Sequence, residues 1–243
     1  MRFNEPKLDT ARHIEHLRSS KGEIETEDQR RAFERAVEAT ERVVESDGYQ
    51  IGRLVSHLRR SHDIVKYNYD KLEDVFKKTH DVSSLSWNEV QSLSREFLAV
   101  FSNFVVSAKS RENLTRDVVL PDLDQYHPIS SITSTYEEKI REFNVDLHGY
   151  FFTSFRNYLV HEGVPKTFVV VHPSRDEGQR NGLTVYKDML SESNTFTAAA
   201  RGYMDAWEDV IDIEEASKGY YEALEQLYDW FFQYTRTVYE PEY

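Results

Sequence analysis

The chain of 243 residues contains no cysteine. This absence excludes disulfide bonds, thiolate nucleophiles and zinc sites built on cysteine. Only nine glycines and six prolines are present to interrupt regular structure, which favours long helices over many short strands. No apolar run approaches the roughly 20 residues that a membrane-spanning helix needs. The first residues also lack the apolar core of a secretory signal, so we expect a cytoplasmic protein.

Positive charge is in short supply. Lys and Arg number 30 against 43 Asp and Glu, which gives a formal net charge of -13 and argues against broad electrostatic capture of nucleic acid. The imbalance is largest in residues 203–243, where eleven carboxylates face only Lys218 and Arg236. In residues 151–190, by contrast, five basic and four acidic residues nearly cancel. That region is locally near neutral within an acidic protein.

Hydrophobic residues make up 39% of the chain, enough for a packed core, and they recur at helical spacing. Thr26 is a good N-cap for a helix over residues 26–46, which Asp47 and Gly48 end. A helical pattern resumes over residues 49–80, with a kink or break near residues 61–63. Ser86 and Glu89 form a capping-box pattern for a strong helix that continues to about residue 115.

The second half of the chain predicts further helices. Pro121 and Pro128 bracket a loop, and the next helical pattern covers residues 134–161. A long acidic helix is expected over residues 197–237, where residues 211–213 and Gly219 are the candidate interruptions.

Between these helices lie two β-branched runs, residues 167–172 and 182–187, joined by a polar segment that contains glycine. This arrangement predicts a β-hairpin insert over residues 166–188. We therefore expect one mainly α domain over residues 1–243, an antiparallel helical bundle that carries a small β-hairpin and, at residues 1–22, a polar N-terminal extension.

Three polar residues at the end of helix 134–161 are the main candidates for function. Asn157 and His161 share a helical face, Arg156 lies one step round from them, and Gly163 and Pro165 follow as stop signals. Metal-free RNA cleavage needs a base for the 2′-hydroxyl and a cation for the charged phosphate. His161 suits the first role and Arg156 the second, while Asn157 could position either group.

The pattern Arg-Asn-x3-His, closing an amphipathic helix of an all-α bundle, resembles the HEPN superfamily (higher eukaryotes and prokaryotes nucleotide-binding). The resemblance implies a metal-independent endoribonuclease without a cofactor, with Arg156, Asn157 and His161 as catalytic residues. It also implies RNA as substrate, a toxin–antitoxin or phage-defence setting with a partner protein, and a homodimer whose two motifs face each other. Arg156 and His161 lie about 140° apart around an ideal helix, so pairing two copies would also help both groups reach one phosphate.

Other interpretations of the motif remain open. His161 could cap its helix through the macrodipole and Arg156 could pair with an acid, as in a non-catalytic HEPN-like scaffold that binds nucleotide, RNA or protein. A helical interaction protein is a third interpretation. The chain contains a second match to the loose spacing, Arg141-x6-His148, in which Glu142 is expected to neutralise Arg141.

Weaker candidates lie elsewhere. Lys166, His172 and Arg175 could extend an RNA-contacting surface, although decoration of a turn is the better interpretation of His172 and Arg175. His13 and His16 have a spacing that metal ligands use, but no third ligand is near, so no metal site is predicted.

Overall fold

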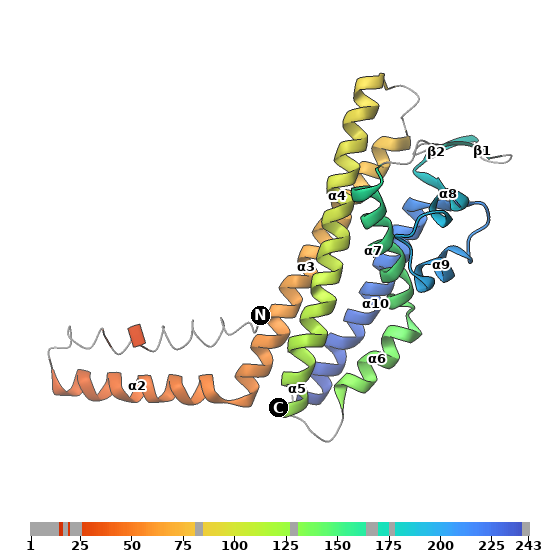
Figure 1. Cartoon of the computed structure of the whole chain (residues 1–243). Coiled ribbons are helices and arrows are strands. Elements are labelled where there is room, and N and C mark those ends of the chain that lie inside the picture. Colours follow the sequence, from red (N-terminus) through yellow and green to blue (C-terminus); the bar gives the residue numbers. More distant parts are fainter. Residues whose placement is uncertain are drawn as a thin grey trace.

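The computed structural model of the chain describes residues 15–16, 19, 26–80, 85–126, 131–163, 170–174 and 178–239. It is mainly helical, as predicted. Long helices pack side by side into a bundle, and helix α2 projects from one end of it as an arm (Figure 1).

The first two long helices follow one another without a loop. Helix α2 (Glu27–Glu45) has the predicted cap at Thr26, where Thr26 and Gln29 complete a capping box. Ser46 ends α2 in an extended conformation, and α3 (Asp47–His80) begins at the next residue. Gly48 therefore lies inside α3 and does not stop a helix. The expected break at residues 61–63 is absent, because Leu58 and Val65 bury the same side of one continuous helix.

The prediction of helix α4 (Trp87–Leu114) is confirmed, including the capping box of Ser86 and Glu89. The expected loop from Pro121 is wrong. The chain stays helical through the π-helix η3 (Thr115–Val119) and then α5 (Leu120–Tyr126). Proline lacks the N–H that an α-helix interior requires. Here Leu120, just before Pro121, donates to the carbonyl of Thr115 in the wider π pattern, and the helix continues across the proline. Pro128 lies outside the described residues.

Residues 134–161 form two helices where one was expected. Helix α6 (Ile132–Glu142) stops at Phe143, and α7 (Val145–His161) starts after Asn144. Asn144 has a φ of 57°, in the left-handed region, which asparagine tolerates better than most residues. A local backbone preference thus overrides an apolar pattern that runs on through the break.

The β structure has the predicted kind but different strands. β1 (Val170–Ser174) pairs with β2 (Gly178–Gly182) in an antiparallel hairpin. β3 (Thr184–Tyr186) belongs to a second sheet, where it pairs with β4 (Val210–Asp212). The second predicted run, residues 182–187, does contain a strand, but its predicted partner was wrong, because Val185 is buried in the core opposite Ile211 of β4.

The remaining elements are α8 (Lys187–Ser191), α9 (Ala198–Met204) and α10 (Ile213–Tyr239). The expected helix over residues 197–237 is interrupted by β4, at one of the two predicted places, whereas α10 continues through Gly219.

Aromatic rings of α4, α7 and α10 fill the centre of the bundle. Phe101 of α4 lies 5.4 Å, centroid to centroid, from Phe155 of α7, and Phe152 stacks on Tyr220 of α10 at 5.2 Å. These contacts hold α7 between the two longer helices. Throughout the described part of the chain, no helix combines the length and hydrophobicity that crossing a membrane requires.

Candidate active site at the end of helix α7

The predicted motif lies on the last turns of α7. Phe155, Tyr158 and Leu159 are buried and fix this end of the helix in the bundle. Arg156 and Asn157 are half-buried between those anchors, and His161 is exposed at the final helical position. The structure thus brings the three residues to one end of one helix.

Arg156 is turned toward its neighbour. Its Nη1 donates to Oδ1 of Asn157 at 3.1 Å, while its Nε is buried without a hydrogen-bond partner. Among the described residues, no carboxylate forms an ion pair with Arg156. The guanidinium therefore keeps a buried donor and its positive charge available at this site.

The helix ends where the sequence predicted. The N–H of Glu162 donates to the carbonyl of Tyr158 at 2.8 Å. Gly163 follows with a φ of +95°, which a residue without Cβ adopts readily. Pro165 lies outside the described residues.

A second segment of the chain holds this helix end in place. Oε1 of Glu162 accepts hydrogen bonds from Oγ of Ser193 and, at 2.6 Å, from Oγ1 of Thr195. Arg201 fixes the same segment by donating to the carbonyls of Ser191 and Ser193 at 2.6 and 2.8 Å.

The Glu162 carboxylate directly follows the motif in the chain. The hydrogen bonds from Ser193 and Thr195 lower the pKa of Glu162 below its ordinary value, and the nearby His161 lowers it further. The ionised carboxylate thus stands next to the candidate base. Sequence analysis missed this contact because its partners lie 31 and 33 positions away.

The weaker candidates do not join the site in the described residues. Lys166 and Arg175 lie outside those residues. His172 lies in β1, where its backbone is opposite Arg180 of β2. His13 is also outside them, and His16 is exposed. No group of three His, Asp or Glu side chains that could hold a metal occurs in the described ranges.

The second Arg/His spacing does not form a site. Arg141 ends α6 and its Nε donates to the carbonyl of Glu137, whereas His148 lies on α7. Burial lowers the pKa of His148 to about 4. The expected partner of Arg141 was wrong, because Glu142 pairs with Lys139 at 2.7 Å.

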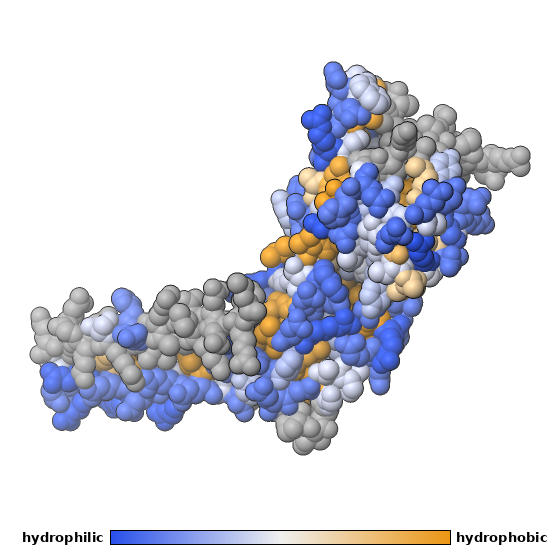
Figure 2. All heavy atoms as spheres, viewed as in Figure 1, coloured by the Kyte–Doolittle hydropathy of each residue, from blue (hydrophilic) through white to orange (hydrophobic). Residues whose placement is uncertain are grey.

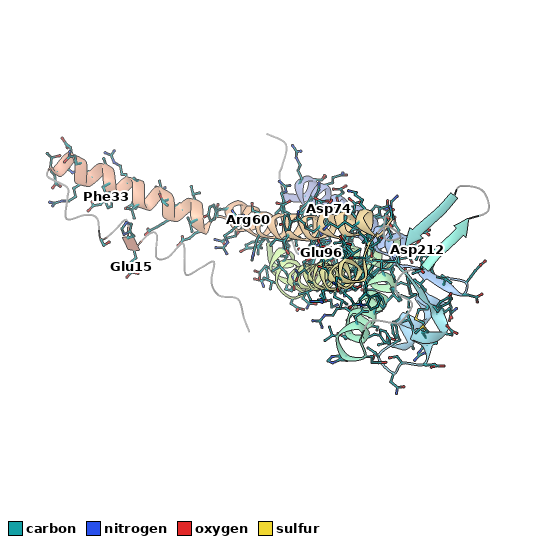
Figure 3. The ribbon with its side chains drawn as sticks, turned by 90° about the horizontal axis from the view of Figure 1, so that it is seen from above. Glu15, Phe33, Arg60, Asp74, Glu96 and Asp212 are labelled. Atoms are coloured by element: carbon teal, nitrogen blue, oxygen red, sulfur yellow. The ribbon has the colours of Figure 1, made fainter. Side chains whose placement is uncertain are left out.

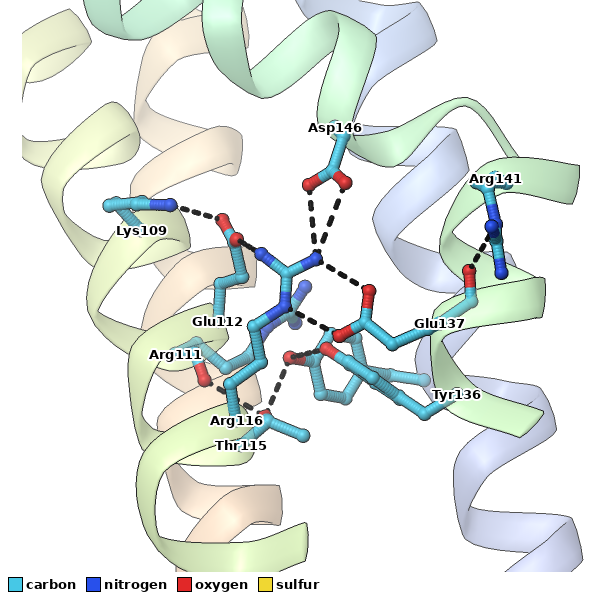
Figure 4. A network of polar contacts seen from close by, with 10 residues as sticks. Lys109, Arg111, Glu112, Thr115, Arg116, Tyr136, Glu137, Arg141 and Asp146 are labelled. Atoms are coloured by element: carbon cyan, nitrogen blue, oxygen red, sulfur yellow. Dashed lines mark hydrogen bonds and ion pairs between the residues drawn. The ribbon is translucent and has the colours of Figure 1, made fainter. Parts of the chain in front are cut away.

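A partly buried charged network, which the sequence did not reveal, lies where α4 passes into η3. Figure 4 shows Arg116 at its centre, bonded to carboxylates from three helices. Its Nε and Nη2 donate to Glu137 of α6, its Nη2 lies 3.3 Å from both oxygens of Asp146 of α7, and its Nη1 donates to Glu112 of α4. The network joins the α6–α7 pair to α4 and leaves Arg116 fully occupied, so it is a structural centre.

Arg111, at 0% exposure, lies close to this network. Its Nη1 donates to Nδ1 of His62, and its guanidinium carbon lies 3.6 Å from the ring centroid of Tyr228. Because Nδ1 accepts, the neutral imidazole carries its proton on Nε2, which lies 2.9 Å from Glu225. The side chains of Arg111, His62 and Glu225 thus form a row that connects α4, α3 and α10.

The chain matches no protein-family model, no curated protein and no solved structure. The resemblance to HEPN proteins therefore depends on the motif residues and the helical bundle alone.

Proposed function

We propose that the protein is a metal-independent endoribonuclease of the HEPN type. The observation that carries the proposal is the state of the motif: an exposed imidazole at a helix end, five residues after a guanidinium that pairs with no described carboxylate. Arg116, by contrast, is held by carboxylates from three helices.

The roles follow from the chemistry of the groups. Neutral His161 removes the proton from the RNA 2′-hydroxyl, and the 2′-oxygen attacks the adjacent phosphorus. Arg156 offsets the negative charge that develops on the phosphate oxygens. The 5′-oxygen leaves and takes a proton from water, and His161 returns its proton to solvent, so the products are a 2′,3′-cyclic phosphate and a 5′-hydroxyl. Asn157 orients Arg156 through their hydrogen bond.

The proposal includes a symmetric dimer. Tyr150 and Val160 are large hydrophobic residues with 47% and 55% exposure. By helical periodicity they lie within about 60° of Asn157 around α7, as does His161. An apolar surface beside the motif supports pairing of two α7 helices, which would gather two sets of catalytic groups. The HEPN resemblance places such an enzyme in toxin–antitoxin or phage-defence systems, with a partner protein that restrains it.

The test is RNA cleavage in EDTA. The purified protein should convert mixed RNA to fragments with 2′,3′-cyclic phosphate ends. His161→Ala and Arg156→Ala should each reduce the rate by at least about a hundredfold, the usual size of such contributions. Asn157→Ala should reduce it less, because Asn157 acts through Arg156.

Arg141→Ala is the matched control, since it removes an exposed arginine from the second, unassembled spacing. It should leave the rate within about twofold. Equal cleavage by all variants, which would indicate a contaminant, or no cleavage by the parent would overturn the proposal and leave the non-catalytic scaffold as the better interpretation.

A further inference from the structure

One side of α3 carries a continuous stripe of basic and aromatic residues. The spacing of four and three residues repeats along it, so all members lie on one side of the helix. None of them is acidic. We call this set the α3 stripe; its members are Arg53, His57, Arg60, Ile64, Tyr67 and Lys71.

The α3 stripe is open to solvent over most of its length. His57 and Arg60 are exposed, and Ile64 and Tyr67 have 57% and 61% exposure. Among the described residues, no carboxylate forms an ion pair with Arg60. Lys71 lies 5.6 Å from the ring centroid of Tyr67 and pairs with Asp74 only at 3.9 Å, where both side chains are about half exposed. A pair of that kind contributes little.

Of the helices that pack on α3, α10 brings the carboxylates of Glu222 and Glu225 near Tyr69 and His62, which lie on the side of α3 opposite the stripe. Asn68 of α3 donates to the carbonyl of Asn103 at 3.4 Å, and Lys78 pairs with Glu96, which fixes α3 and α4 as antiparallel neighbours. The stretch of α4 between these two contacts and a turn beyond, residues 97–107, contains no acidic residue. Arg60 lies on α3, thirteen residues after the start of that helix, on the side of the bundle toward α2 in the view of Figure 3.

The charge of this surface is opposite to that of the whole molecule. Residues 53–71 contain five Lys or Arg and two Asp or Glu, within a chain of net charge -13. Figure 2 shows patches of hydrophobic surface near the α3–α4 border, between hydrophilic side chains, and smaller ones along the arm and near α8 and α9. Cations in a line beside an exposed aromatic ring suit a single-stranded nucleic acid, whose phosphates contact the cations while a base stacks on the ring.

The stripe also has a physical connection to the motif. Helices α3 and α7 flank α4 on two sides (Figure 1). Phe101 of α4 contacts Phe155 of α7, and Glu96 of α4 contacts Lys78 of α3. The end of the stripe and the end of α7 are thus within about two turns of each other along α4. Exposed Arg95 lies on α4 over the same stretch.

We infer that the α3 stripe binds the sugar–phosphate backbone of single-stranded RNA and leads the strand across α4 to the motif on α7. The second half of this inference rests on the proposed ribonuclease function. Binding by the stripe does not, and it can be measured separately.

The experiment measures binding of a fluorescein-labelled 20-nucleotide oligouridylate by anisotropy in EDTA. The full chain carries His161→Ala, so that the RNA stays intact. Adding Arg60→Glu and Lys71→Glu should weaken binding at least tenfold. The slope of log K against log salt should become shallower by about 1.4, because each phosphate contact on a single strand contributes about 0.7.

Lys77→Glu with Lys218→Glu is the matched control. Both lysines are exposed, lie off the stripe and make only short-range helical ion pairs, and the change in net charge is identical. This pair should alter affinity by less than about threefold. Tyr67→Leu should weaken binding about fivefold or more, whereas Tyr67→Phe should retain it.

The outcomes separate this inference from the ribonuclease proposal. If both charge-reversed pairs weakened RNA binding equally, or if the His161→Ala chain did not bind RNA, the proposal that the α3 stripe binds RNA would be overturned. If RNA binding depended on the stripe but the parent did not cleave RNA, the proposed role of the stripe in binding would be supported and the ribonuclease proposal would be overturned. Cleavage by the parent with unchanged binding in the Arg60/Lys71 pair would overturn the stripe alone.

Discussion

His62 lies between a guanidinium and a carboxylate inside the bundle. Its burial, and secondly the charge of Arg111, lower its pKa from the ordinary 6.5 to about 4. The folded protein therefore keeps this imidazole neutral at pH values where the unfolded chain binds a proton. Protonation in the folded state would place two cations against each other and would remove the acceptor that Arg111 uses.

This arrangement predicts an acid-dependent loss of stability. The contribution of His62 is fully present above the unfolded pKa of 6.5 and is lost as pH falls toward 4. The slope attributable to one such group is at most about 1.4 kcal/mol per pH unit. Urea unfolding of the parent and of His62→Gln between pH 7.5 and 4.5 measures it, since glutamine can still accept from Arg111 but does not titrate.

In His62→Gln, the free energy of unfolding should depend less steeply on pH between 6.5 and 4.5, by the slope that uptake of about one proton on unfolding produces. Replacement of His57, which is exposed on the same helix, should leave the slope unchanged. Identical slopes for the parent and His62→Gln would contradict the assigned neutral state.

Residues whose partners are close in sequence were predictable, and those with distant partners were not. The caps at Thr26 and Ser86 follow from contacts within three residues. Nothing near Arg111 or Glu162 in the sequence distinguishes either residue from an ordinary surface charge. Their environments come from His62, 49 positions away, and from Ser193, 31 positions away.

The break between α6 and α7 decides where α7 points. Asn144 is exposed, and its role is its left-handed backbone rather than a side-chain contact. The apolar pattern runs across the break with helical spacing, so periodicity alone predicted one helix. The strand prediction failed for a related reason: the partner of Thr184–Tyr186 is β4, some 26 residues later, and β-branched composition cannot identify a partner.

Substitutions at Asn144 test this origin of the break. Asn144→Ala should lower the free energy of unfolding by about 1 kcal/mol, the approximate cost of a left-handed Cβ. Asn144→Gly should stay within about 0.5 kcal/mol of the parent, because glycine adopts this conformation freely. Thermal or urea unfolding gives both values.

Asn113→Ala is the comparison for that pair, since Asn113 is exposed within the regular helix α4. It should be neutral or slightly stabilising, because alanine favours helix. A loss of stability equal to that of Asn144→Ala would show that backbone conformation is not the cause.

At the scale of the whole molecule, the mainly α bundle was predictable from composition and periodicity, whereas the projecting arm α2 was not. Its cap and its apolar stripe are those of any surface helix. The direction of α2 comes from Ser46, whose extended backbone separates two helices that the sequence joins directly.

The proposed dimer makes a prediction at this scale. Tyr150→Glu with Val160→Glu should convert the protein to a monomer in sedimentation equilibrium and reduce RNA cleavage in parallel, because carboxylates would be desolvated where two α7 helices meet. Tyr186→Glu, at an exposed tyrosine on β3, should preserve the parent's mass and rate. A parent that cleaves RNA as a monomer would exclude the shared site.

The hydrogen bonds from Ser193 and Thr195 to Glu162 determine when, during synthesis of the chain, the end of α7 can be held in place. Ser193 and Thr195 lie some thirty residues beyond the helix that they hold, and Phe151 acquires its neighbours Phe196 and Tyr203 only from that later stretch. A chain emerging from the ribosome therefore carries Arg156 and His161 before the surroundings that fix them exist. Translation must therefore pass residue 203 before the surroundings of the proposed site are complete.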